Sequence, residues 1–163
     1  MAPGDRKSLR PRDLLASLES HGVDFVVIGG FALAPHGYVR ATKDVDIVPA
    51  PTPDNLARLA SALDQLETQV ELGDMEQGEL GITPDKEGLA LGGNWVLQTR
   101  FGRLDVMQDV PGMRSYEALR DTAVRVSGVL YAGYEELIRL KLAAGRPEDV
   151  RDVGALQAAR GNR

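Results

Sequence analysis

One stretch decides the fold of this chain: Phe25-Val-Val-Ile-Gly-Gly-Phe-Ala-Leu-Ala-Pro-His-Gly-Tyr-Val-Arg-Ala-Thr-Lys-Asp-Val-Asp-Ile-Val48. Its first four residues are apolar, β-branched in the main and followed by glycine, which predicts a short buried strand. A helix is expected to begin at Phe31, so Gly29 and Gly30 lie at a strand-to-helix turn. Because glycine has no side chain, backbone N–H groups and the positive end of the helix can approach a phosphate there.

Two aspartates follow on a second apolar stretch. Asp44 and Asp46 are two residues apart, so on a strand both carboxylates project from one face. Arg40 and Thr42 share that face if the strand begins near Arg40. Paired carboxylates beside a phosphate turn predict a Mg²⁺ site, because hard oxygen ligands suit this ion and the phosphate completes its coordination shell. An isolated Asp-x-Asp is more often a solvated strand end, and the upstream glycine pair favours the metal site.

This order of motifs resembles the DNA polymerase β-like nucleotidyltransferase superfamily. The resemblance extends over most of the chain, but only the stretch quoted above is specific. The segment Arg40-Ala-Thr-Lys-Asp-Val-Asp46 is most similar to a small bacterial branch of that superfamily. This branch includes minimal nucleotidyltransferases and the AbiEii-type toxins of abortive-infection and toxin–antitoxin systems.

The resemblance implies a third metal-binding carboxylate on a later strand. Asp105 matches it, because Leu104 and Val106 flank the acid as strand neighbours should. Asp109 precedes Val110-Pro-Gly112, a turn signal that places it beyond the strand, which favours Asp105.

The C-terminal part carries a weaker signal. The segment from Leu137 to Asp152 resembles a Lys-Leu-x-Ala-x-Arg-x-x-Asp-x-x-Asp pattern common at the end of small nucleotidyltransferases. Lys141 lies on the stripe of an otherwise apolar helix, where it either snorkels to the surface or reaches the triphosphate as a point charge. Asp149 and Asp152 are interpreted instead as members of a structural ion-pair network with Arg146.

The resemblance implies an α+β fold: a small mixed β-sheet with helices packed mainly on one face. It also implies transfer of a nucleoside monophosphate from an NTP to an acceptor hydroxyl, with pyrophosphate leaving. Two Mg²⁺ ions about 3.5–4 Å apart are expected, with Mn²⁺ able to substitute. The expected catalytic and metal-binding residues are Asp44, Asp46 and Asp105. The expected nucleotide-binding residues are Gly29, Gly30, Arg40, Thr42 and Lys141.

The acceptor stays open from the sequence: tRNA, a protein and a small molecule all fit, and an antitoxin partner is implied if the chain is a toxin or a phage-defence component. The competing hypothesis is a non-catalytic module that keeps the fold and binds a nucleotide or a partner. Such a module is expected to have lost a carboxylate, and this chain keeps all three candidates.

Composition agrees with a small cytoplasmic enzyme. The 163 residues contain no cysteine, which excludes disulfides, cysteine nucleophiles and thiolate zinc sites. No apolar run is long enough for a membrane span, and the N-terminus lacks the apolar region of a signal peptide. The net charge of −5 argues against broad nucleic-acid binding, so no DNA partner is expected. The net negative charge is concentrated in residues 52–90, which form either a solvated face and loop or a surface that binds a basic partner.

Residues 1–11 are interpreted as a flexible leader and residues 12–163 as a single nucleotidyltransferase-like domain. A helix is expected over residues 12–20, and another from the Thr52 cap onward. Residues 74–88 are expected to form a loop. Two strands around Arg100 predict a hairpin. Beyond them the sequence predicts a helix over 115–122, one strand over 125–131, a helix over 134–144 and a final helix from Pro147.

Overall fold

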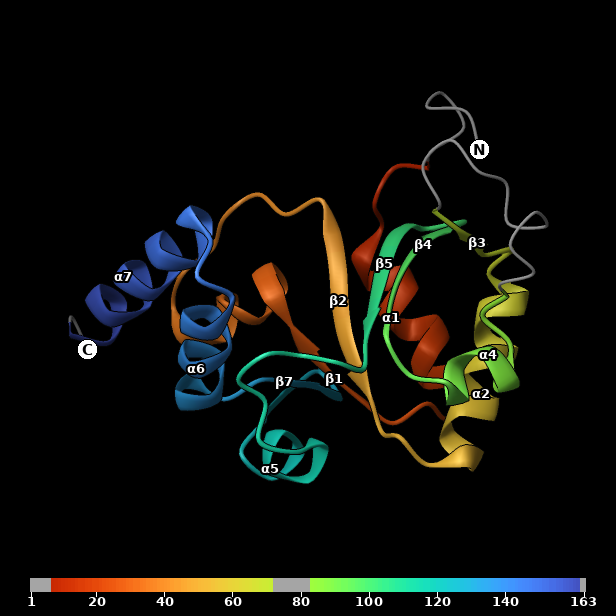
Figure 1. The fold of residues 1–163 in the computed structure, drawn as a ribbon. Helices are drawn as coiled ribbons and strands as arrows, with labels where there is room; N and C mark the ends of the chain where they lie inside the picture. The colour runs from red at the N-terminus through yellow and green to blue at the C-terminus, as the bar shows by residue number, and fades with distance from the viewer. Residues whose placement is uncertain (1–6, 72–82, 162–163) are drawn as a thin grey trace. The chain divides into compact units, whose positions relative to one another are not determined.

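The computed structural model of the chain describes residues 7–71 and 83–161 (Figure 1). The chain divides into two compact units. The first unit comprises residues 1–24 and 49–109, and the second comprises residues 25–48 and 110–163. Much of the expected leader, and part of the acidic region and of the expected loop over 74–88, lie outside the described residues. The single domain over 12–163 stays a prediction.

Within its described residues, the first unit packs helices against an antiparallel set of strands. Its strands run in the order β3-β4-β5, and each pairs antiparallel with its neighbour. Leucines at helical spacing on α1 and α2, such as Leu14, Leu18 and Leu59, are fully buried and form its core. The elements are α1 (Pro11–Ser20), α2 (Pro53–Gln65), β3 (Gln69–Val70), α4 (Lys86–Ala90), β4 (Asn94–Thr99) and β5 (Gly102–Met107).

A buried asparagine on α2 ties together the chain segments that lead into and out of the quoted stretch. Asn55 is fully buried, accepts a hydrogen bond from Asp24 N and donates to Asp24 O and Ala50 O, at 2.7, 2.9 and 2.9 Å. The helix that carries it begins as the sequence predicts, with the Thr52 hydroxyl accepting from Asn55 N at 3.3 Å. These bonds hold Asp24 and Ala50 beside each other.

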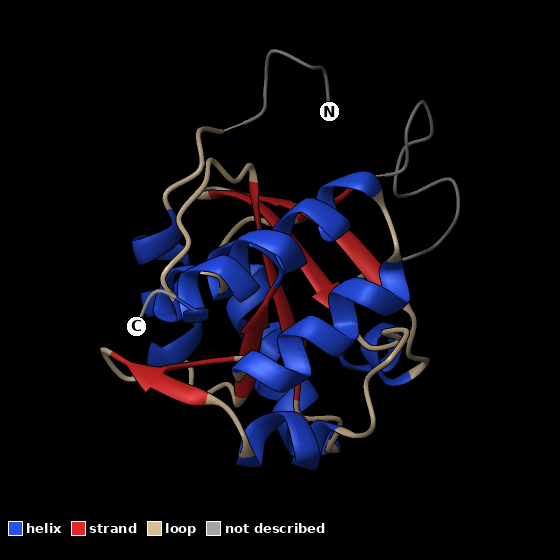
Figure 2. Ribbon diagram, turned by 90° about the vertical axis from the view of Figure 1, so that its left-hand side faces the viewer, coloured by secondary structure: helices blue, strands red, loops and turns tan. Residues whose placement is uncertain are grey.

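The second unit has a mixed sheet. Its strands run in the order β2-β1-β7-β6, with β1 parallel to β7 and β7 antiparallel to β6. The structure contains both helices and strands (Figure 2), and the strands pair in parallel as well as antiparallel, so the predicted α+β fold with a mixed sheet is confirmed. The elements are β1 (Phe25–Ile28), η2 (Gly29–Ala32), η3 (Ala34–His36), β2 (Asp44–Pro49), α5 (Tyr116–Asp121), β6 (Val124–Val126), β7 (Val129–Tyr131), α6 (Tyr134–Ala144) and α7 (Pro147–Gly161).

Several boundaries differ from the sequence-based expectations. The helix after the double glycine consists of two short 3₁₀ segments, η2 and η3, which are separated at Leu33, and Pro35 lies within the second. The single strand expected over 125–131 is a hairpin, because Ser127 and Gly128 both have positive φ, at +50° and +85°, and form its turn. The expected loop over 74–88 gives way to α4 from Lys86, whose cap Asp85 accepts from Gly88 N at 2.8 Å. The predicted hairpin around Arg100 is confirmed as β4 and β5.

No helix within the described ranges is both long enough and apolar enough to cross a membrane.

Candidate active site

The turn after β1 has no room for side chains. Gly29 has a φ of +71°, and a Cβ built on it would lie 2.1 Å from Asp46 Oδ2. A Cβ on Gly30 would lie 2.6 Å from Thr42 Oγ1 and 3.2 Å from Arg40 Nη1. The two glycines therefore allow a carboxylate, a hydroxyl and a guanidinium to lie directly against the backbone of the turn. The structure thus brings together five residues that the sequence predicts for one site.

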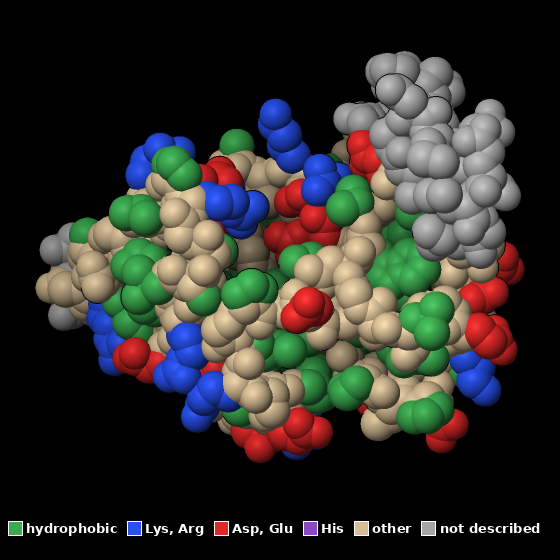
Figure 3. Space-filling view, viewed as in Figure 1, with side chains coloured by type: hydrophobic (Ala, Val, Ile, Leu, Met, Phe, Trp, Pro, Cys, Tyr) green, Lys and Arg blue, Asp and Glu red, His purple; other side chains and the backbone are tan. Residues whose placement is uncertain are grey.

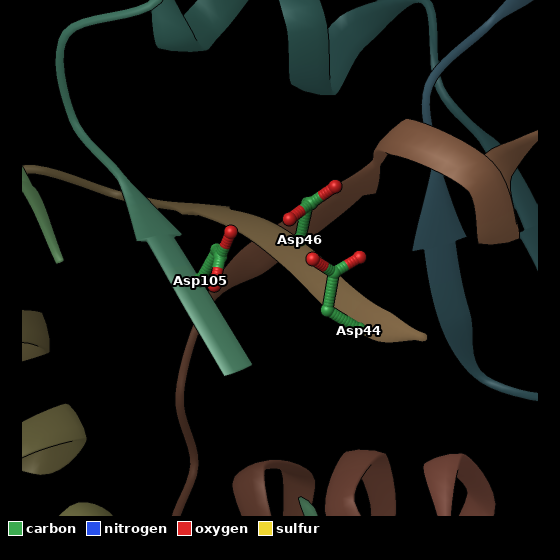
Figure 4. A group of neighbouring side chains, drawn as sticks. All are labelled: Asp44, Asp46 and Asp105. Carbon is green, nitrogen blue, oxygen red and sulfur yellow. The ribbon is translucent and has the colours of Figure 1, made fainter. Parts of the chain in front are cut away.

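The strand β2 presents its acids on one face. Asp44 and Asp46 are half-buried, whereas Val45 and Ile47 between and beyond them are fully buried. Figure 4 shows the two carboxylates standing on the same side of the strand. The strand begins at Asp44 rather than near Arg40, so Arg40 and Thr42 reach the turn from an irregular segment. That segment is fixed in part by the Thr42 hydroxyl, which donates to Arg40 O at 3.3 Å.

The third predicted acid lies on β5 in the first unit. Asp105 is buried, and its neighbours Leu104 and Val106 are fully buried, as expected for the middle of a strand. Arg103, two residues earlier and hence on the same face, donates from Nε and Nη2 to the two carboxylate oxygens of Asp105, both at 2.9 Å. This bidentate pair fixes the orientation of the Asp105 carboxylate.

The three aspartates form a group that could hold a metal ion among the described residues. Asp44, Asp46 and Asp105 each offer one carboxylate oxygen, and these oxygens lie within 4.8 Å of one another (Figure 4). Carboxylate oxygens are the donors that Mg²⁺ and Mn²⁺ prefer, so the donor set fits a hard divalent ion. The group is therefore compatible with divalent metal binding.

Arg40 is held by a buried acid from α7. Its Nε and Nη2 donate to the two oxygens of Asp152, both at 2.9 Å, and Asp152 is only 1% exposed. Hydrogen bonding to Asp152 raises the pKa of Arg40. Burial alone would raise the pKa of Asp152, but the hydrogen bonds from Arg40 and Lys141 outweigh it and hold that pKa below its usual value. The remaining nitrogen of Arg40, Nη1, faces Ala41 O at 3.1 Å and Glu148 Oε1 at 3.4 Å.

Lys141 lies at the buried end of the same network. Its Nζ donates to Asp152 Oδ2 at 2.8 Å and lies 3.8 Å from Asp149 Oδ1. Asp149 in turn accepts from Arg146 Nε at 2.8 Å. Asp149 thus pairs with Arg146 as expected, whereas Asp152 pairs with Lys141 and Arg40. Direct contact between Lys141 and a triphosphate stays a prediction.

The contacts that three residues make with the predicted site residues were not predicted from the sequence, although Asp152 was assigned to an ion-pair network. Arg103 could have been found, since an arginine two residues before an aspartate on a strand shares its face. Asp152 and Glu148 could not, because nothing local to α7 indicates that it packs against a segment more than a hundred residues earlier.

The fold matches solved nucleotidyltransferase structures. No protein-family model matches the chain, and the comparison with curated proteins gives no match either. Among solved structures, ANT(2'')-Ia in complex with adenylyl-2''-tobramycin has a TM-score of 0.51 at 15% identity, over 93% of this chain and 92% of that one. A proposed nucleotidyltransferase from Thermotoga maritima has a TM-score of 0.53 at 15% identity, over 96% of this chain and 98% of that one. The chain has a nucleotidyltransferase fold.

One larger solved structure matches the chain over only part of its own length. The Megavirus polyadenylate synthase has a TM-score of 0.54 at 14% identity, over 91% of this chain but 31% of that one. At these identities the likeness concerns the fold.

Proposed function

We propose that this protein is a metal-dependent nucleotidyltransferase. The observation that carries the proposal is the position of Asp46. Its carboxylate lies both in the group of three acids and against Gly29, at the turn where a phosphate can approach the backbone. A divalent metal site and a phosphate turn that share a residue are what phosphoryl transfer requires, because the metal neutralises the charge of the phosphate that it holds.

The three acids would bind the metal, and one of them would also accept a proton. Asp44, Asp46 and Asp105 would hold the two Mg²⁺ ions, with Mn²⁺ as a substitute. The bound ions would supply charge neutralisation at the α-phosphate and lower the pKa of the acceptor hydroxyl. Asp105 accepts the proton of that hydroxyl, while Arg103 keeps the carboxylate in place through its two hydrogen bonds.

The second unit holds the triphosphate. The backbone at Gly29 and Gly30 approaches the phosphates, and Thr42 Oγ1 and Arg40 Nη1 donate to their oxygens from positions already next to the turn. Lys141 adds positive charge from behind Arg40. The acceptor oxygen forms a bond to the α-phosphorus, the bond from that phosphorus to the bridging oxygen breaks, and pyrophosphate leaves. The rate gain comes from positioning and charge neutralisation.

The acceptor is a hydroxyl of tRNA, of a protein or of a small molecule. The Arg-x-Thr-x-Asp-x-Asp segment supports placement in the AbiEii-type branch, and with it a toxin or phage-defence role and an antitoxin partner. The relation of fold to ANT(2'')-Ia with adenylyl-2''-tobramycin supports a small-molecule acceptor, and that to a polyadenylate synthase supports RNA.

A binding module without catalysis is the competing class. Calorimetry with MgATP, MgCTP, MgGTP and MgUTP separates the two classes. The enzyme should bind at least one nucleotide in a metal-dependent manner, and Asp44→Ala should abolish that binding. Asp109→Asn, which removes an exposed acid just beyond β5, should leave it unchanged. Absence of metal-dependent binding of any of the four nucleotides by the unmodified protein would contradict the proposal.

A further inference from the structure

Two acids on α7 contact Arg40 in opposite ways. Asp152 is 1% exposed and engages Nε and Nη2 bidentately at 2.9 Å. The Glu148 side chain is 53% exposed and lies 3.4 Å from Nη1. A buried, two-bond partner fixes the plane of a guanidinium, whereas an exposed, single and longer contact is weak and easily exchanged.

The nitrogen that Asp152 leaves unused is the one that points at the glycine turn. Arg40 Nη1 lies 3.2 Å from where a Cβ of Gly30 would be. Asp152 therefore neutralises the charge of Arg40 and also orients its guanidinium, so that Nη1 faces the turn where a phosphate oxygen would lie. Figure 3 shows basic and acidic side chains side by side at the surface over the start of α7, the end that carries Glu148.

We propose that α7 controls the binding of the triphosphate. Asp152 is a positioning residue that orients Arg40 toward the phosphates. Glu148 contacts Arg40 Nη1 until a phosphate displaces it. This inference rests on the proposed function, because it presumes that a triphosphate binds at the turn. Lys141 belongs to the same device, since its bond to Asp152 Oδ2 at 2.8 Å holds the carboxylate that holds Arg40.

The direction in which Asp152→Asn changes the affinity for a polyanion distinguishes a positioning role from a purely electrostatic one. Removing an acid that lies near a polyanion site but holds no metal lessens repulsion and should strengthen binding of the polyanion. Asp152→Asn should instead weaken it, because asparagine offers one acceptor oxygen in place of two, so the bidentate pair is lost and Arg40 loses its orientation. Glu148→Gln should strengthen it, since the competing contact is lost.

The test is equilibrium binding of magnesium tripolyphosphate, which reports on the phosphate grip independently of the base. We expect Asp152→Asn to bind about tenfold more weakly, and Arg40→Lys likewise, because lysine keeps the charge but not the fork. Glu148→Gln should bind about two- to fivefold more tightly, the range of an exposed ion pair. Arg40→Lys and Glu148→Gln alter partly exposed side chains, so they report even if Asp152→Asn folds poorly.

Two controls match these variants. Asp149→Asn removes a second buried acid of α7 that contacts Lys141 but not Arg40, and should not weaken binding. Glu135→Gln removes an acid of α6 that pairs with Arg160, and should not strengthen it as Glu148→Gln does. In an Arg40→Ala background, Asp152→Asn should cost no further affinity, because its effect passes through the lost guanidinium.

The possible outcomes distinguish a failure of this inference from a failure of the proposed function. If the unmodified protein binds neither magnesium tripolyphosphate nor any MgNTP, both are overturned. If it binds and Asp152→Asn binds equally or more tightly, only the inference is overturned. If Asp152→Asn lowers the tripolyphosphate affinity further in the Arg40→Ala background, Asp152 has a purely structural role. That result would also overturn the inference.

Discussion

Gly29→Ala should destroy the metal site while leaving the protein folded. The new Cβ would lie 2.1 Å from Asp46 Oδ2, more than 1 Å short of the 3.4 Å at which ordinary contact begins. Metal–oxygen bonds tolerate only about 0.2 Å of error. The carboxylate must therefore swing away from the position in which it ligates, and Mn²⁺ affinity should fall by tenfold or more, about 1.4 kcal/mol.

The same change also carries a backbone cost, which must be separated from the clash. Alanine at a φ of +71° loses about 1–2 kcal/mol, the usual penalty for a left-handed non-glycine residue. Gly93→Ala is the matched control, because Gly93 has a φ of +82° and no atom within 4 Å of its Cβ position. Both variants should lose similar free energy of unfolding from backbone strain, and only Gly29→Ala should lose the metal.

Mn²⁺ titration by electron paramagnetic resonance measures the affinity, and urea denaturation measures the free energy of unfolding. The geometry described here would be refuted if Gly29→Ala bound Mn²⁺ as tightly as Gly93→Ala. It would also be refuted if Gly29→Ala unfolded while Gly93→Ala did not, since the turn would then be a packing element first.

Three further predictions concern the acids and the turn. Asp46→Asn should leave the melting temperature of the metal-free protein unchanged or higher, because neighbouring carboxylates repel, while calorimetry shows Mg²⁺ binding lost; a large drop in melting temperature would make Asp46 structural. Because the folded pKa of Asp152 lies below its unfolded value near 4, its contribution is present above that value and lost as pH falls through the folded pKa. The free energy of unfolding should therefore fall less between pH 7 and pH 3 in Asp152→Asn than in the unmodified protein, and equal slopes would contradict this. Gly30→Val places a branched side chain against Thr42 and Arg40, so MgNTP affinity should fall tenfold or more with the fold intact, and unchanged affinity would remove the phosphate from this turn.

The local parts of the site could be predicted from the sequence because each depends on neighbours in the chain. The buried positions of Val45 and Ile47 follow from strand alternation, and the same period places Asp44 and Asp46 on the other face. The hairpin of β6 and β7 was open to prediction too, since Ser127-Gly128 is a turn dipeptide that the apolar residues around it obscured.

The ion pairs that Asp152 makes with Lys141 and Arg40 could not be predicted in this way. Lys141 on an apolar stripe has the same pattern whether it snorkels to solvent or pairs with buried acids. The contacts of α6 and α7 decide the matter, and they place Asp152 on both Lys141 and Arg40. Such pairing depends on how helices pack across a long sequence separation, which neither periodicity nor spacing records.

The most direct test of the central claim is label transfer from nucleotides that carry ³²P at either the α- or the γ-position. Each is incubated with Mg²⁺, total cell tRNA, protein and small molecules. The unmodified protein and Asp109→Asn should transfer the α-label from at least one nucleotide to one of these fractions, and Asp44→Asn should not. Among the reaction products, the γ-label should appear in pyrophosphate alone. Transfer of the γ-label, or α-transfer that survives Asp44→Asn, would contradict nucleotidyl transfer at this group of aspartates.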